Sequence, residues 1–211
     1  MYAQDILRLL QQHYAPSQLD HANRIFAENR LQNCWKDWLS AEILNVLLQQ
    51  GLSEHISIDL PYPNVAQIAG RSDAPAYLTT KAPFKSAKAC EKRYASKCDF
   101  AFNIDDQQLF VEMRCANTRE FLTTRENKKF SDDFKRVKAL QQRNENLNIL
   151  VLFALYGCIT PEDMQLVQQF DNSHTCSYVW DTGLTGSTSI GRLAHVQRNG
   201  EARLLIIAHN T

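Results

Sequence analysis

The sequence carries no net charge, because 23 lysines and arginines balance 23 aspartates and glutamates among its 211 residues. A balanced chain has no overall attraction to nucleic acid or to an anionic membrane, so any such attraction has to come from a local surface. The sequence also lacks a hydrophobic run of transmembrane length and an N-terminal signal segment. We therefore expect a single globular domain over residues 1–211, located in the cytoplasm.

The six cysteines lack the spacing of a metal site, since no Cys-x-x-Cys pair occurs and the histidines are scattered. Several cysteines lie in apolar strand patterns, where a free thiol behaves as a small hydrophobic side chain. We expect all six to be reduced. With 44% hydrophobic residues, the chain is able to bury a substantial core.

Positive charge is scarce in one part of the chain and concentrated in another. Residues 81–138 contain 14 lysines and arginines against 9 acidic residues, whereas residues 144–191 contain five acidic residues and no lysine or arginine. The middle of the chain is therefore the expected place for an anionic partner, the alternative being an uneven solvated surface. A long, turn-rich connection over residues 61–95 is expected to be a functional loop that contacts nucleic acid. Its basic cluster consists of Lys81, Lys85, Lys88, Lys92 and Arg93. Lys135 and Lys138 are further predicted contacts with nucleic acid.

Hydrophobic periodicity predicts helices on both sides of a group of strands. The expected helices cover residues 5–14, a segment that begins at Ser17, and residues 33–50, 130–143 and 161–170. The expected strands are a segment from residue 55, a hairpin over residues 98–115, the runs "NILVLFAL" and "CSYVW", and a C-terminal hairpin turned at Asn199 and Gly200. This order predicts an α/β fold in which helices flank both faces of a central mixed sheet.

The hairpin "CDFAFNIDDQQLFVEMRC" contains two carboxylates, Asp99 and Glu112, in segments that are otherwise suited to burial. A turn centred between residues 106 and 107 would place Asp99 opposite Arg114, with Glu112 as its diagonal neighbour on the same face. Two such carboxylates repel each other unless a cation lies between them. The alternatives are a shared divalent ion, or an ion pair between Asp99 and Arg114 with Glu112 at the rim.

A third carboxylate, Glu42, lies in the helix expected over residues 33–50. It falls on the apolar stripe of Trp35, Trp38, Leu39 and Val46. A lone glutamate there would be costly to bury, so it needs a partner. One interpretation is an oxygen-rich site for Mg²⁺ or Mn²⁺ built from all three carboxylates. The other is a bond from Glu42 to a buried arginine or tyrosine.

These residues resemble the PD-(D/E)xK nuclease superfamily over about residues 33–155. The resemblance rests on Glu42 in its helix, "CDFAF" with Asp99, "FVEMR" with Glu112 and Arg114, and the helix "FSDDFKRVKAL". It implies a restriction-endonuclease-like fold between N-terminal helices (1–50) and a C-terminal helix and strands (156–211). It also implies Mg²⁺-dependent cleavage of nucleic acid, more often DNA than RNA. Asp99, Glu112 and Glu42 would then bind the metal.

The sequence departs from the family pattern at two positions. Cys98 replaces a proline, and Arg114 replaces the lysine that supports the chemistry. Arginine cannot readily lose a proton, so Arg114 would stabilise charge only, or Lys135 or Lys138 would reach the site, or activity is lost. The alternative to a nuclease is therefore an inactive member of the same fold that binds another protein, as an inhibitor or immunity protein does, or that serves as a subunit of a nucleic-acid complex.

Overall fold

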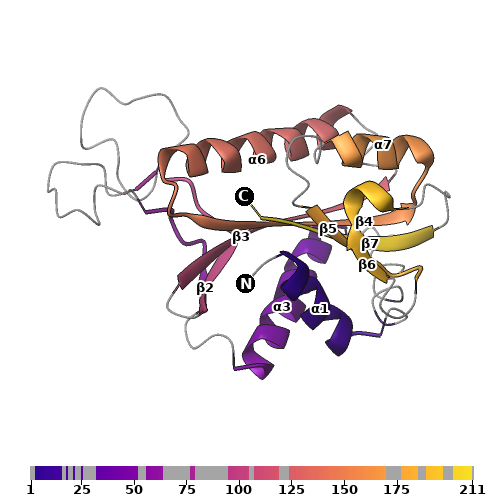
Figure 1. Ribbon diagram of the computed structural model, residues 1–211, viewed down its shortest axis with the longest axis horizontal. Coiled ribbons are helices and arrows are strands. Elements are labelled where there is room, and N and C mark those ends of the chain that lie inside the picture. Colours follow the sequence, from indigo (N-terminus) through magenta and orange to yellow (C-terminus); the bar gives the residue numbers. More distant parts are fainter. Residues whose placement is uncertain are drawn as a thin grey trace, which may run out of the picture.

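The computed structural model describes residues 3–15, 18, 21, 25, 32–51, 56–63, 77–78, 95–104, 107–118, 124–169, 177–184, 189–196 and 202–210. A seven-stranded mixed sheet lies at its centre, with the strand order β1-β2-β3-β4-β7-β5-β6. Helices α6 and α7 cover one face of the sheet and helices α1 and α3 cover the other (Figure 1). The predicted α/β class, with helices on both faces of a mixed sheet, is confirmed.

The element bounds agree with most of the periodicity in the sequence. The helices in the described part are α1 (Ala3–His13), α3 (Gln32–Gln49), α6 (Thr124–Arg143), α7 (Pro161–Gln169) and the short 3-10 helix η4 (Leu193–His195). The strands are β1 (Ser57–Ile58), β2 (Phe100–Ile104), β3 (Gln107–Asn117), β4 (Asn148–Cys158), β5 (Ser177–Asp181), β6 (Ile190–Arg192) and β7 (Ala202–Asn210).

The centre of the sheet is built from β3, β4 and β7. Strands β3 and β4 are parallel and are joined through α6, whereas β4 pairs antiparallel with β7. The apolar run of β4 is buried from Ile149 to Leu155, as expected for a strand that is covered on both faces. Each large aliphatic side chain buried in this way contributes about 1.5–3 kcal/mol to stability.

Each face of the sheet has its own hydrophobic cluster. On the α1 and α3 side, Leu7 of α1 and Leu39 of α3 pack with side chains of β2, β3 and β4. On the α6 and α7 side, Phe130 and Val137 of α6 pack against the opposite face of the same strands. A side chain of β2 or β3 therefore has different helical neighbours depending on the face to which it points.

The predicted C-terminal hairpin is wrong. Strands β6 and β7 do not pair with each other, because β5 lies between them and pairs with both. The 3-10 helix η4 ends β6 after three residues, and the aliphatic residues of β7 are buried between β4 and β5. The turn predicted at Asn199 and Gly200 lies outside the described residues.

The strand predicted from residue 55 is short, because β1 contains only Ser57 and Ile58. The next residue, Asp59, has φ of 54°, in the left-handed region that interrupts a strand. Of the helices that the structure describes, none is both long enough and apolar enough to cross a membrane.

Candidate functional site

The register of β2 and β3 differs from the predicted one. Phe100 lies opposite Val111, and Ile104 lies opposite Gln107. The predicted turn would instead have placed Phe100 opposite Met113, so the pairing is shifted by two residues along β3. Alternation of apolar residues fixes the face to which a strand side chain points, but it is compatible with more than one turn position. The predicted opposition of Asp99 and Arg114 is therefore wrong.

A β-bulge at Asp99 changes which side chains share a face. The backbone N–H of Asp99 donates to the Val111 carbonyl at 3.0 Å, while Phe100 is also paired with Val111. Two residues thus oppose one, and the alternation of side chains is interrupted. As a result Cys98 packs on the α6 side with Ala101, whereas Phe100 packs on the α1 and α3 side.

The Asp99 carboxylate has two partners. Its Oδ1 forms an ion pair with the Lys36 ammonium of α3, and its Oδ2 accepts a hydrogen bond from the Met113 backbone N–H at 2.6 Å. The ion pair is partly solvated, since the Lys36 side chain is 41% exposed. Asp99 therefore neutralises a lysine on the α3 side and accepts a hydrogen bond from a β3 amide directly before β2 begins.

The Glu112 carboxylate points to the opposite side of the sheet, toward α6. Its Oε1 accepts a hydrogen bond from the Tyr62 hydroxyl at 2.6 Å, and its Oε2 accepts one from Arg136 Nη2 of α6 at 2.5 Å. Glu112 is 8% exposed. Burial raises the pKa of Glu112, the bonds from Arg136 and Tyr62 lower it, and the charge of Asp99 adds a smaller rise. Burial and the neighbouring Glu112 charge also raise the pKa of Tyr62.

Arg114 points toward α6 as well. Its Nε donates to Asp133 Oδ2 at 2.7 Å, and its Nη2 contacts the same oxygen. The other oxygen of Asp133 lies 4.0 Å from Arg136 Nε, one helical turn further along α6. Glu112 and Arg114 on β3 thus face Arg136 and Asp133 on α6, and the four charges alternate in sign. We refer to these four residues as the Glu-Arg network.

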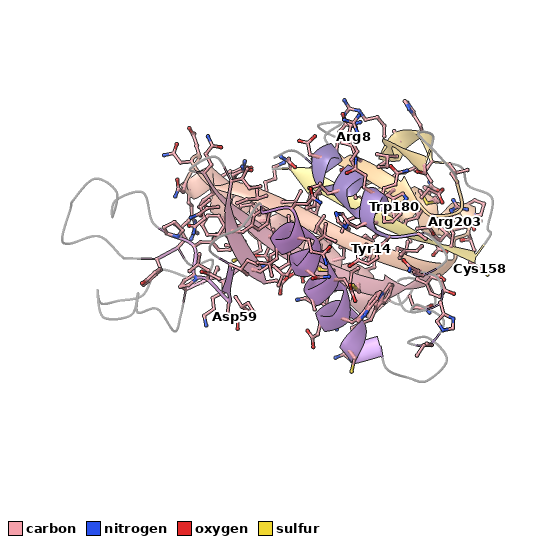
Figure 2. All side chains as sticks on the ribbon, turned by 90° about the horizontal axis from the view of Figure 1, so that it is seen from below. Arg8, Tyr14, Asp59, Cys158, Trp180 and Arg203 are labelled. Carbon is pink, nitrogen blue, oxygen red and sulfur yellow. The ribbon has the colours of Figure 1, made fainter. Side chains whose placement is uncertain are left out.

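Glu42 is bound at a different place. Its carboxylate accepts a hydrogen bond from the Tyr14 hydroxyl, and Tyr14 directly follows α1, beside α3 in Figure 2. Burial and the bond to Glu42 raise the pKa of Tyr14 to about 12. Glu42 is half-buried, since the fully buried stripe of α3 includes Leu39 and Ile43 and passes beside it. The expected alternative, a bond from Glu42 to a tyrosine, describes this position.

The three carboxylates are each bound to a different partner. Glu42 is bonded to α1, Asp99 to α3, and Glu112 to α6 on the other side of the sheet. In the part of the chain that the structure describes, no group of three or more His, Cys, Asp or Glu side chains is placed to hold a metal ion. Mg²⁺ and Mn²⁺ require several oxygen ligands converging on one point, so this arrangement does not fit either ion.

No family model matches this chain, and neither the curated proteins nor the solved structures contain a significant match.

The predicted nucleic-acid-binding lysines fall into two groups. Lys135 and Lys138 are exposed on α6, whereas their neighbour Arg136 points inward to Glu112. Neither lysine therefore takes the place of the family lysine beside Glu112. The basic loop lies outside the described residues, and this applies to Lys81, Lys85, Lys88, Lys92 and Arg93.

Sequence reasoning missed the basic partners of the two strand carboxylates. Lys36 lies 63 residues before Asp99, and Arg136 lies 24 residues after Glu112, so no local pattern joins them. A signal did exist within α6. Asp133 and Arg136 are one helical turn apart, and their charges are opposite to those of Arg114 and Glu112, which they contact.

The space beside the Glu-Arg network is about 20 Å³, enough for about one water molecule and too small for a nucleotide.

Proposed function

We propose that this chain acts by binding a partner and does not itself cleave phosphodiester bonds. The observation that carries the proposal is the Glu-Arg network. Glu112 and Arg114, which stand where a PD-(D/E)xK nuclease has its glutamate and lysine, are both engaged by charges on α6. Their role in this chain is to join a helix to the sheet.

Charge balance supports the same conclusion. A catalytic Mg²⁺ is held by carboxylates whose negative charge is left for the metal, and the metal then activates water. Here Glu112 is neutralised by Arg136, and Asp99 by Lys36. A divalent ion would have to displace a cation from each carboxylate and bridge two sides of the sheet.

The order of elements supports descent from a nuclease-like arrangement. Helix α3 is followed, after the short β1, by β2 beside Asp99, then by β3 with Glu112, and then by α6. This is the order on which the family resemblance rests. A restriction-endonuclease-like fold that has lost its metal chemistry would combine this order with the ion pairs described above.

A Mg²⁺-dependent nuclease is the second candidate, and one observation favours it. Lys36 is in direct contact with Asp99. The family pattern has a lysine at the position of Arg114, and Lys36 would supply this residue type from α3. In this alternative, the ion pairs would open when metal and nucleic acid bind, and Lys36 would supply the positive charge beside the reacting phosphate.

Cleavage assays separate the two candidates. The wild-type chain is incubated with single- and double-stranded DNA and RNA in Mg²⁺ and in Mn²⁺, beside Asp99→Asn and Glu112→Gln purified in the same way. We expect no metal-dependent cleavage by any of the three proteins. Cleavage by the wild type that disappears in both variants would refute the proposal and establish the nuclease.

A further inference from the structure

The outer face of α6 is strongly basic. From Thr124 to Arg143 the helix contains seven lysines and arginines and three acidic residues. Arg136 alone among the seven points into the Glu-Arg network, and the other six are exposed. These six are Arg125, Lys128, Lys129, Lys135, Lys138 and Arg143. We refer to them as the α6 basic face.

The spacing of these residues follows the helix. Lys128 and Lys135 lie two helical turns apart on one side of α6, and the other four residues flank them within about half of the circumference of the helix. From Arg125 to Arg143 the helix rises roughly 27 Å. Helix α6 runs along the outside of the sheet and forms an outer layer of the molecule (Figure 1). The charges therefore form an extended row rather than a point.

Acidic residues reduce this charge only in part. Asp133 lies beside Arg114 and Arg136, so its negative charge is balanced within the Glu-Arg network. Asp132 is exposed among the lysines and opposes their effect. Together with Glu126 these carboxylates leave an excess of four positive charges on the helix.

The side chains between the charges indicate the kind of anionic partner. Phe130 is buried and Phe134 packs in the core, so α6 presents no exposed aromatic ring on which an unpaired base could stack. The exposed positions of α6 are also polar, which leaves no apolar side chain to enter a membrane. What remains is a row of cations suited to phosphates.

We propose that the α6 basic face binds the phosphate backbone of double-stranded DNA without reading its sequence. This inference rests on the proposed binding function, and it specifies the surface that binds and the partner that is bound. The major groove of B-form DNA is wide enough to admit an α-helix, whereas that of an RNA duplex is too narrow. Duplex DNA is therefore the partner that fits an exposed basic helix.

The test is a fluorescence anisotropy titration with a random duplex of about 25 base pairs in EDTA, at salt concentrations from about 50 mM upward. Lys135→Glu is compared with Arg8→Glu, an exposed arginine on α1 that lies across the sheet (Figure 2). Losing one phosphate contact costs about tenfold in affinity at about 50 mM salt and lowers the salt slope by about one. We expect Lys135→Glu to show both effects, Lys128→Glu/Lys135→Glu to show about twice the loss in log K, and Arg8→Glu to bind as the wild type does.

Asp132→Asn provides a test in the opposite direction. Removing the exposed carboxylate from the row should tighten binding, and thermal melts should show that the variants remain folded. The inference is overturned if the wild type fails to bind duplex DNA at about 50 mM salt, or if Lys135→Glu and Arg8→Glu weaken binding equally. Tighter binding to single strands, duplex RNA or anionic vesicles than to duplex DNA would also overturn it. None of these outcomes bears on cleavage, which the metal assays decide separately.

Discussion

The bond between Glu112 and Arg136 gives the sharpest stability prediction. Glu112→Gln removes the negative charge but retains an oxygen that can accept the hydrogen bond from Tyr62. Arg136→Met removes the cation and leaves a carboxylate that is 8% exposed without its ionic partner. Both changes therefore leave a charge in the interior that its partner no longer balances.

The magnitude follows from the burial of the two groups. Breaking a fully buried ion pair by removing one partner costs about 3–5 kcal/mol. The Arg136 side chain keeps 24% exposure and has Asp133 at 4.0 Å, so water and a second carboxylate offset part of the loss. We expect each single variant to lose about 2–3 kcal/mol of the free energy of unfolding. The double variant should lose less than the sum, with a coupling energy of about 1–2 kcal/mol.

The effect should also depend on pH. Without Arg136, the folded-state pKa of Glu112 rises further, because burial is no longer opposed by the cation. A carboxyl group whose folded pKa is raised binds its proton more tightly in the folded state. Its stability contribution is therefore greatest below the unfolded pKa of about 4.3 and is lost as pH rises through the folded pKa. Arg136→Met should be closer to the wild type at about pH 4.5 than at about pH 7.5.

Urea unfolding of the wild type, the two single variants and the double variant at both pH values measures all of these quantities. Additive single effects, each below about 0.5 kcal/mol, would show that the network does not join α6 to the sheet. The structural role assigned to Glu112 would then be wrong.

Three further variants test other parts of the structure by thermal or urea unfolding. Gly157→Ala should lower the free energy of unfolding by at least about 2 kcal/mol, because φ is 130° and the new Cβ would overlap Thr118 Oγ1. An unchanged unfolding midpoint would contradict this geometry. Tyr62→Phe removes a hydrogen bond to the Glu112 carboxylate and should cost about 1.5–3 kcal/mol at neutral pH, so a neutral result would mean that water replaces the hydroxyl. Thr160→Ala removes the side chain that caps the first turn of α7 and should cost about 1 kcal/mol, while Thr160→Ser should cost less; equal losses would contradict a capping role.

The strongly periodic elements could be predicted from the sequence. Helix α3, strand β4 and the start of α7 after Thr160 follow from apolar spacing, a continuous buried run and a capping signal, each of which is local. Element type therefore depends mainly on information within the segment itself.

The candidate site could not be predicted to the same degree. The bulge at Asp99 changes the face to which Cys98 points, and nothing in the alternation of "CDFAF" marks its position. The choice between a metal site and ion pairs depends on Lys36 and Arg136, which only the tertiary fold brings to the carboxylates. The sequence thus marked Asp99 and Glu112 as carboxylates that need partners, whereas the partners themselves required the structure.

Calorimetric titration of Mn²⁺ into the wild-type protein tests the central claim most directly, because catalysis of this type depends on metal bound by Asp99 and Glu112. With Asp99 bonded to Lys36 and Glu112 to Arg136, we expect no binding tighter than millimolar and the same weak heat from Asp99→Asn. Stoichiometric binding in the micromolar range that is lost in Asp99→Asn and in Glu112→Gln would contradict the account and restore the carboxylates as a metal site.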